Sequence, residues 1–530
     1  MKKSNVLLMG ILMLITLAAA SCMQSEDSQT DDILNRIPDN ADMVLVGNLN
    51  TIIEAAGGSA KNGQITLPSY ISETLSEAQL AEWEETKKII NDSGADTDVC
   101  AVMVYYEKDT EEYPVIIFHL SDKDKFLKFI ESNGYQESYN ENGTVIYNGE
   151  ETEIETEYGT STQYNCIGVN DAYAYYVPQI AEGMYDPYMS LDYIIGRASE
   201  SPYSKNAFAS YLTSGNAMSA AIRTPVEMSR TIMAGGMPLP LKNMPEGVIC
   251  MAGNIEKEKM TVKVKYCDNE GKPLNAFGDC TAMADTKARI NADALTYLGE
   301  NECLVEAISL KSVDWDKCLQ LASKNMSRNE RATLPIIRQY LEKIDGTVAI
   351  GMGLNSGLCT IEEFCTTLLT NASFTFVVET KNGEAQKLMA DAQNALESFG
   401  MQYEKTPDGI SMAIPGMAGT IALEAHGDII VLANHKIDKS SRQPATKTFD
   451  FGKHQAAMVL CLDNASTLMN DLKMKNDVLL SVCSNAEECE VIMELQIKGG
   501  KSDGIIANAV DIAKTVAESL EQSNAFRLVQ

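Results

Sequence analysis

The sequence predicts an α+β fold: an internally duplicated unit of antiparallel sheets with helices packed on one face. The first observation is a repeat, because about eight elements follow one another in the same order twice along the chain. The second is that apolar strand patterns recur around Asn-Gly and Asp-Gly turns, which favour antiparallel pairing. The third is composition, since 45% hydrophobic and 22% charged residues are typical of folded domains.

Each copy opens on a strand that enters a short helix, and a second apolar strand then enters a longer helix. The opening segments are 41–56 and 301–319, the second strands are 115–120 and 374–378, and the longer helices are 122–133 and 385–399. Ser121 and Asp124 form a capping-box pattern at the start of the first long helix. Gly134 and Gly400 follow the two helices, and we expect both to end them in the left-handed conformation.

Each copy closes with a long alternating hairpin and a final helix. The hairpins are 247–266 and 477–498, and the helices are 282–298 and 505–520. The last helix of the first copy leads directly into the first strand of the second, so we expect close packing of the two halves. The predicted segments are a signal peptide at 1–21, a flexible acidic tether at 22–36, a first α+β repeat unit at 37–290 and a second at 291–530.

The N-terminus predicts export and a lipid anchor. Lys2 and Lys3 precede an apolar run at 6–17, which is too short to span a bilayer and is typical of a cleaved signal peptide. Small residues at 18–21 lead to Cys22, a pattern that resembles a bacterial lipobox. Acyl chains such as palmitate on Cys22 would contribute about 0.8 kcal/mol per buried CH₂, enough to hold the protein at a membrane. The alternative is an ordinary secretory signal followed by an incidental cysteine.

The net charge argues against two classes of partner. The chain has 43 Lys and Arg residues against 74 Asp and Glu residues, a formal net charge of -31. Proteins bind nucleic acids and anionic lipid surfaces through basic faces. We therefore do not expect such an acidic protein to bind either of them through electrostatic attraction.

Catalytic and metal-binding patterns are missing from the sequence. There is no GxSxG, HExxH or EF-hand pattern, and the Gly351–Gly357 stretch is interpreted as a strand end rather than a dinucleotide loop. The 12 cysteines besides Cys22 permit disulfides, with Cys359/Cys365 and Cys483/Cys489 close in sequence, but none forms a CxxC pair. The histidines are scattered: His119, His426, His435 and His454. We therefore predict no catalytic residue, no metal site and no cofactor.

One loop could contact a partner. Methionine and proline are concentrated around 228–251, and the predicted contact residues are Met233, Met237, Pro238, Leu239 and Pro240. Methionine adapts its shape to many partners, and such a loop can form an adaptable apolar surface. The alternative is a buried crossover between a helix and a hairpin.

The segment 37–50 (Ile-Pro-Asp-Asn-Ala-Asp-Met-Val-Leu-Val-Gly-Asn-Leu-Asn), the lipobox and the duplicated layout resemble a family of Bacteroidetes lipoproteins known as domain of unknown function 4836. The resemblance covers most of the mature chain. It implies an exported lipoprotein of a diderm bacterium, and it supplies no activity and no functional residues.

These observations predict a membrane-anchored exported lipoprotein, most simply a non-enzymatic binding or scaffold protein of the cell envelope. We expect it at the outer membrane, facing the periplasm or the cell surface, with an envelope protein or a glycan as partner. The alternatives are a hydrolase with an unrecognised site and a small-ligand binder in the cleft between the repeats. An enzyme should show a polar pocket with perturbed titratable groups, whereas a scaffold should show an exposed apolar patch.

Overall fold

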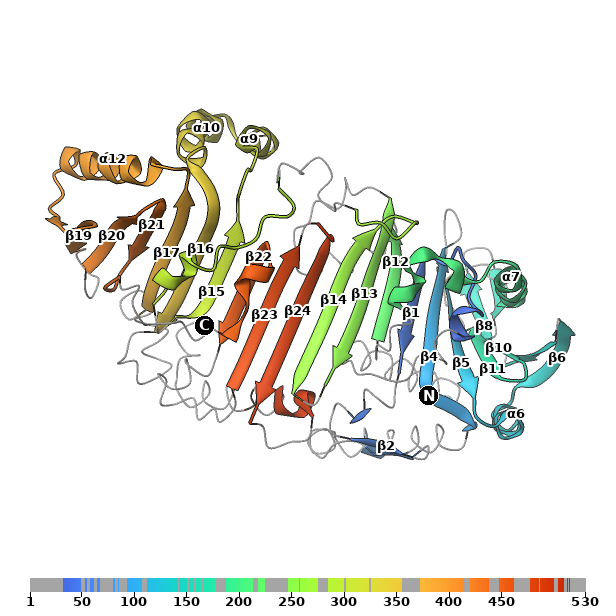
Figure 1. Cartoon of the computed structure of the whole chain (residues 1–530). Coiled ribbons are helices and arrows are strands. Elements are labelled where there is room, and N and C mark those ends of the chain that lie inside the picture. The colour runs from blue at the N-terminus through green and yellow to red at the C-terminus, as the bar shows by residue number, and fades with distance from the viewer. Residues whose placement is uncertain are drawn as a thin grey trace. The chain divides into compact units, whose positions relative to one another are not determined.

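The computed structural model (Figure 1) describes several separate stretches of the chain. They are residues 32–48, 53–54, 58–61, 64–66, 80–81, 84, 93–106, 112–141, 143–149, 152–156, 159–163, 165–177, 187–212, 218–224, 246–256, 258–274, 285–299, 302–323, 326–354, 372–413, 420–437, 448–461, 477–485, 487–499, 504–509, 512 and 514.

The chain divides into two compact units. The first comprises Met1–Leu274 with Lys501–Asn508, and the second Asn275–Gly500 with Ala509–Gln530. The division therefore falls earlier than the change of repeat predicted after residue 290. The physical reason is that Ile290, Ala294 and Leu295 are buried in the hydrophobic core of the second unit.

The first unit is built on an antiparallel sheet. Among the described residues, ten strands pair in the order β14-β13-β12-β1-β4-β5-β11-β10-β7-β6. Their bounds are β1 Met43–Gly47, β4 Ala95–Tyr106, β5 Glu112–Leu120, β6 Gln136–Glu141, β7 Thr144–Asn148, β10 Cys166–Val169, β11 Tyr173–Val177, β12 Met218–Thr224, β13 Gly247–Ile255 and β14 Lys259–Cys267. Two separate hairpins join β2 Ser59–Lys61 to β3 Gln64–Thr66, and β8 Thr152–Thr156 to β9 Gly159–Gln163.

The second unit is also built on an antiparallel sheet. Ten strands of the described residues pair in the order β24-β23-β22-β15-β16-β17-β21-β20-β19-β18. Their bounds are β15 Glu302–Ser309, β16 Ile344–Leu354, β17 Ala372–Thr380, β18 Glu404–Lys405, β19 Gly409–Ala413, β20 Thr420–His426, β21 Ile429–Ala433, β22 Ala456–Cys461, β23 Asp477–Asn485 and β24 Glu490–Lys498. The prediction of an α+β fold built on antiparallel sheets is thus confirmed.

Helices of the first unit lie on both faces of its sheet, so the prediction that they pack on one face is wrong. Alternate residues of a strand point to opposite faces. On β5, Ile117 shares a cluster with Leu191 of α7 (Pro187–Glu200), whereas Phe118 packs with Phe126 and Ile130 of α6 (Lys123–Ser132). Two short 3₁₀ helices, η1 Tyr203–Lys205 and η2 Ala207–Tyr211, add to the α7 face.

Helices of the second unit divide in the same way. Val377 of β17 and Val431 of β21 pack with Leu295 of η5 (Ala294–Tyr297), whereas Ile430 of β21 packs against the cluster that contains Met389 of α12 (Glu384–Ser398). The remaining helices of the unit are α9 Trp315–Ser323, α10 Arg328–Leu341 and η7 Phe451–Lys453. Among the described residues, no helix combines the length and apolar character needed to cross a membrane.

Local signals in the sequence predict some helix ends and miss others. Gly134 and Gly400 have φ values of 90° and 68°, as expected for left-handed ends. The cap of α6 is Asp122 rather than Ser121, because the Asp122 side chain accepts the Lys125 N–H while the Ser121 hydroxyl donates to the Gly94 carbonyl. The helix predicted over 282–298 is wrong: within 285–298 only η5 forms.

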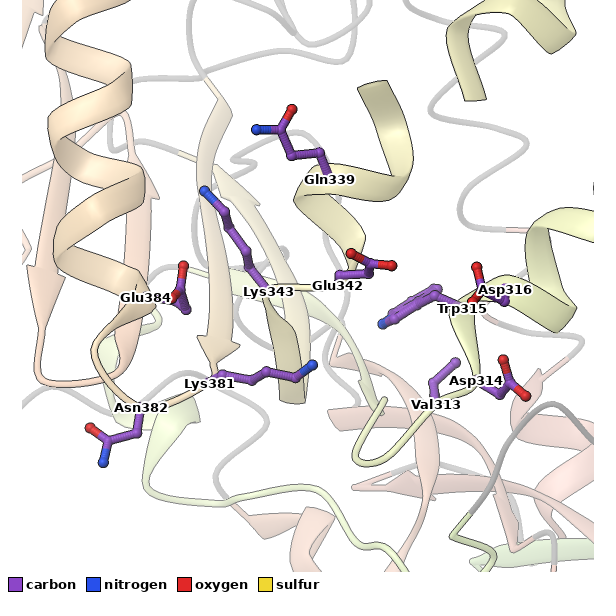
Figure 2. A pocket seen from close by; sticks show the side chains of 10 residues that line it. All are labelled: Val313, Asp314, Trp315, Asp316, Gln339, Glu342, Lys343, Lys381, Asn382 and Glu384. Carbon is purple, nitrogen blue, oxygen red and sulfur yellow. The ribbon is translucent and has the colours of Figure 1, made fainter. Parts of the chain in front are cut away.

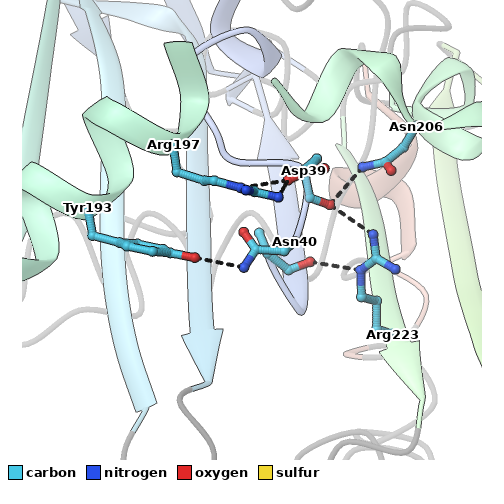
Figure 3. Close-up of polar contacts among 7 residues, drawn as sticks. Asp39, Asn40, Tyr193, Arg197, Asn206 and Arg223 are labelled. Atoms are coloured by element: carbon cyan, nitrogen blue, oxygen red, sulfur yellow. Dashed lines mark hydrogen bonds and ion pairs between the residues drawn. The ribbon is translucent and has the colours of Figure 1, made fainter. Parts of the chain in front are cut away.

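A polar network ties the chain before β1 to the α7 side of the first unit (Figure 3). Arg197 of α7 donates to the Asp39 carboxylate at 3.0 Å, and Asn40 donates to the Tyr193 hydroxyl at 2.9 Å. Arg223 of β12 donates to the Asp39 carbonyl at 2.8 Å, and through Nε to the Ala41 carbonyl at 3.3 Å. These contacts give the Pro-Asp-Asn-Ala segment a structural role.

Candidate functional site

A polar pocket of about 600 Å³ opens in the second unit between α9, α10 and the turn from β17 into α12. Figure 2 shows the side chains that line it. They are Val313, Asp314, Trp315, Asp316, Gln339, Glu342, Lys343, Lys381, Asn382 and Glu384. Its volume lies within the range of about 300–1,000 Å³ that small-ligand sites occupy.

The loop that carries Trp315 is fixed at both ends. Ser312 has a φ of 58°, an uncommon left-handed conformation for a residue other than glycine. Its backbone N–H donates to the Asp345 carboxylate at 2.7 Å, which holds the turn against the start of β16. Asp314 caps α9, because its side chain accepts the Lys317 N–H at 3.0 Å. Trp315, the first residue of α9, is thereby held at the pocket wall.

Ion pairs join α9 to the end of α10. Arg338 of α10 lies 2.8 Å from the Asp316 carboxylate and 2.6 Å from that of Glu342. All three side chains are partly exposed, so the stability gained is small, but the geometry fixes the two carboxylates relative to each other. One guanidinium therefore pairs with two carboxylates and offsets part of the negative charge on the acidic side of the pocket.

The opposite wall comes from two loops that hydrogen-bond to each other. The Lys381 N–H donates to the Lys343 carbonyl at 2.8 Å, and the Lys343 ammonium lies 3.3 Å from the Asp391 carboxylate. A hydrogen bond from Lys387 lowers the pKa of the Glu384 carboxyl, which is therefore ionised at neutral pH. An ionised carboxylate cannot act as a general acid, so Glu384 does not suit acid catalysis.

The pocket is suited to a neutral ligand with many hydroxyl groups. Its carboxylates and Lys343 have charge partners or a capping role within the protein, so an ionic ligand would have to displace existing contacts. Gln339, Asn382 and Lys381 offer further donors and acceptors. Trp315 adds an aromatic surface, and Figure 2 shows its indole nitrogen directed toward the pocket.

A second group of polar side chains lies at one end of the second sheet. Glu302 begins β15, Thr375 lies on β17 and His435 follows β21. The Thr375 hydroxyl donates to the Glu302 carboxylate and lies 2.7 Å from Nε2 of His435. Nδ1 of His435 lies 3.0 Å from the Lys436 carbonyl, which places a proton on Nδ1. Thr375 thus bridges an acid and an imidazole.

This Glu302 cluster is inaccessible to a substrate. Glu302 and Thr375 are fully buried, and burial raises the pKa of the Glu302 carboxyl. Gly351 on the neighbouring strand β16 leaves the space that the carboxylate fills. A nucleophile must be reached by its substrate, so we assign the cluster to the architecture of the sheet and not to catalysis.

None of the predicted site residues belongs to the part of the chain that the structure describes. Cys22 and the predicted contact loop (Met233, Met237, Pro238, Leu239 and Pro240) lie outside the described residues. The four histidines pair locally: His119 with Asp96 at 3.1 Å, His426 with Glu424 at 2.8 Å, His435 with Thr375, and His454 stacked on Phe449. Eight cysteines of the described residues, Cys483 and Cys489 included, are thiols that form no disulfide.

Sequence reasoning missed the Trp315 pocket. Its residues come from segments 313–316, 339–343 and 381–384, which no short motif connects. The signal available in the sequence was the segment Asp314-Trp315-Asp316. It places one of the two tryptophans of the chain between two carboxylates.

Apolar side chains are exposed on one face of the second sheet. Met352, Phe376 and Met458 have 41%, 39% and 39% of their surfaces exposed. They alternate with core residues such as Val377 and Val459, so they point away from the η5 core. No contact of the described residues identifies a partner for this patch.

Comparison with family models, curated proteins and solved structures finds no match to the chain. The resemblance to domain of unknown function 4836 therefore stays a prediction.

Proposed function

We propose that the protein is an exported, lipid-anchored binding protein of the outer membrane, and that the Trp315 pocket binds a neutral oligosaccharide. The observation that carries the ligand is the pocket itself: an indole beside amide, ammonium and carboxylate groups that are mostly paired within the protein. Sugars present apolar C–H faces to aromatic rings and hydroxyl groups to polar side chains. The hydrogen bond from Lys387 lowers the pKa of the Glu384 carboxyl, which disfavours Glu384 as a general acid and favours binding without chemistry.

Trp315→Ala tests the ligand. Isothermal titration of the mature chain with neutral hexasaccharides of differing linkage should identify at least one that binds. In the variant, affinity for that sugar should fall by about tenfold or more, a loss of about 1.4 kcal/mol, because the aromatic surface is removed. Phe399→Ala is the control, because Phe399 is an exposed aromatic residue at the C-terminal end of α12 that does not line the pocket, and its affinity should equal that of the unchanged protein. Failure of every hexasaccharide to bind, or equal losses in the two variants, would contradict the proposal.

The anchor follows from the lipobox pattern ending at Cys22. Cys22→Ala removes the thiol that would carry the acyl chains. The variant should therefore lose metabolic labelling with a palmitate analogue and should no longer be found in the membrane fraction. The same fractionation of Cys166→Ala, a buried thiol in β10, is the control. A Cys22→Ala protein that still sediments with membranes would contradict the anchor.

We further propose that the two units are copies of one duplicated unit. The support is that both sheets have ten described strands and follow the same order when β1, β4 and β5 are matched to β15, β16 and β17. The long helices α6 and α12 follow matching strands, β5 and β17. An experimental structure whose two sheets fail to superpose strand by strand would contradict the duplication.

A further inference from the structure

Three side chains of types that can bind a metal ion converge in the second unit: Asp408, Glu424 and His426. Each offers one ligand atom, and these atoms all lie within 4.8 Å of one another. Glu424 and His426 are two residues apart on β20 and therefore share a face of the sheet. Asp408 immediately precedes β19, and Gly409 pairs with Glu424 across the two strands. The hairpin register thus brings an acid from one strand end to an acid and an imidazole of the next strand.

The imidazole is held in place. The Tyr297 ring of η5 stacks on His426 with ring centroids 4.9 Å apart and an interplanar angle of 22°. Nε2 of His426 lies 2.8 Å from a carboxylate oxygen of Glu424. Only 16% of the Glu424 side chain and 23% of the His426 side chain are exposed, whereas Asp408 is exposed. A cation could therefore enter from the Asp408 side and meet two ligands that are already oriented and partly shielded from water.

We propose that Asp408, Glu424 and His426 bind a divalent transition-metal cation, for which Zn²⁺ is the best-suited ion. Two carboxylates neutralise its charge, and the imidazole favours zinc over magnesium or calcium, which prefer oxygen ligands. Three protein ligands leave a coordination position for water. This site does not depend on the Trp315 pocket.

The sequence alone predicts no metal site, because the histidines are scattered and no CxxC pair exists. The ligands instead come from two strands, and only the Glu424-x-His426 spacing was available as a signal. The third ligand, Asp408, is supplied by strand pairing.

Zinc titration of the metal-free mature chain tests the site. Calorimetry should show binding in the micromolar range or tighter, and His426→Asn and Asp408→Asn should each weaken that event by about tenfold or more. His119→Asn is the matched control, because His119 pairs with Asp96 and no cluster of three ligands among the described residues includes it. It should leave the event unchanged. Asp408 is exposed before a strand, so Asp408→Asn should fold normally, and circular dichroism checks this.

Two results would overturn the proposal. One is wild-type protein that shows no zinc binding sensitive to Asp408→Asn or His426→Asn. The other is a calcium affinity equal to that for zinc and unaffected by His426→Asn, which would indicate general attraction of cations to an acidic surface.

Discussion

Replacing Gly351 by alanine should destabilise the protein by about 3 kcal/mol. Gly351 lies on β16 beside Glu302 of β15, and a Cβ atom at this position would overlap the buried carboxylate. The carboxylate cannot swing away freely, because Thr375 is hydrogen-bonded to it and His435 lies 3.5 Å from it. The new methyl group therefore has to break these contacts inside the sheet or separate the two strands.

Urea unfolding followed by circular dichroism measures this effect. Gly196→Ala in α7 is the matched control, because no heavy atom lies within 4 Å of its added Cβ. That control should be neutral or stabilising by about 0.5–1 kcal/mol, since alanine favours a helix. Equal unfolding midpoints for Gly351→Ala and the unchanged protein would show that the Glu302 cluster is not packed as described.

Replacing Arg223 by methionine should also destabilise the protein by about 3 kcal/mol. The guanidinium donates to the Asp39 and Ala41 carbonyls, and to the Asn269 side chain at 2.8 Å. Methionine keeps an unbranched side chain of similar length but has no donor, so the partly buried carbonyls lose charged hydrogen-bond partners. The segment before β1 should then detach from β12, and proteolysis near Asp39 should become faster.

Lys205→Met is the control for Arg223→Met. Lys205 is an exposed cation in η1, and its replacement should change the free energy of unfolding by no more than about 0.5 kcal/mol. Arg223→Met with the stability of this control would show that the network in Figure 3 contributes nothing to the fold.

Strands and hairpins could be predicted where the sequence contains a short apolar run or an alternation of apolar and polar residues. The segments 115–120, 247–266 and 477–498 are apolar runs or hairpins in the sequence and lie in strands of the structure. The prediction of a helix over 282–298 was wrong because it relied on the helical spacing of alanine and leucine residues in this segment. Residues of this segment instead pack into the hydrophobic core of the second unit, where Ile290, Leu295 and Tyr297 are buried without a helical period. Tertiary packing thus overrode local preference.

The placement of helices on opposite faces could not be predicted from the sequence. Both α6 and α7 have an apolar side, and either face of an apolar strand such as β5 could accept it. The candidate site was unpredictable for a related reason. Trp315, Gln339 and Lys381 meet only because α9, α10 and the β17–α12 turn come together at one end of the sheet. Such a meeting depends on strand order, which a single sequence does not encode in a local pattern.

The fluorescence of Trp315 is the most direct measure of whether its indole contacts a bound sugar. In the Trp83→Phe background, Trp315 is the single tryptophan, so all tryptophan emission reports on the pocket. Titration with the tightest-binding hexasaccharide should change the Trp315 emission along a saturable curve, and the dissociation constant from this curve should equal the one from calorimetry. The bound sugar should also reduce the quenching of Trp315 by acrylamide. Sugar binding detected by calorimetry, with unchanged Trp315 emission and unchanged quenching, would show that the sugar does not bind at Trp315.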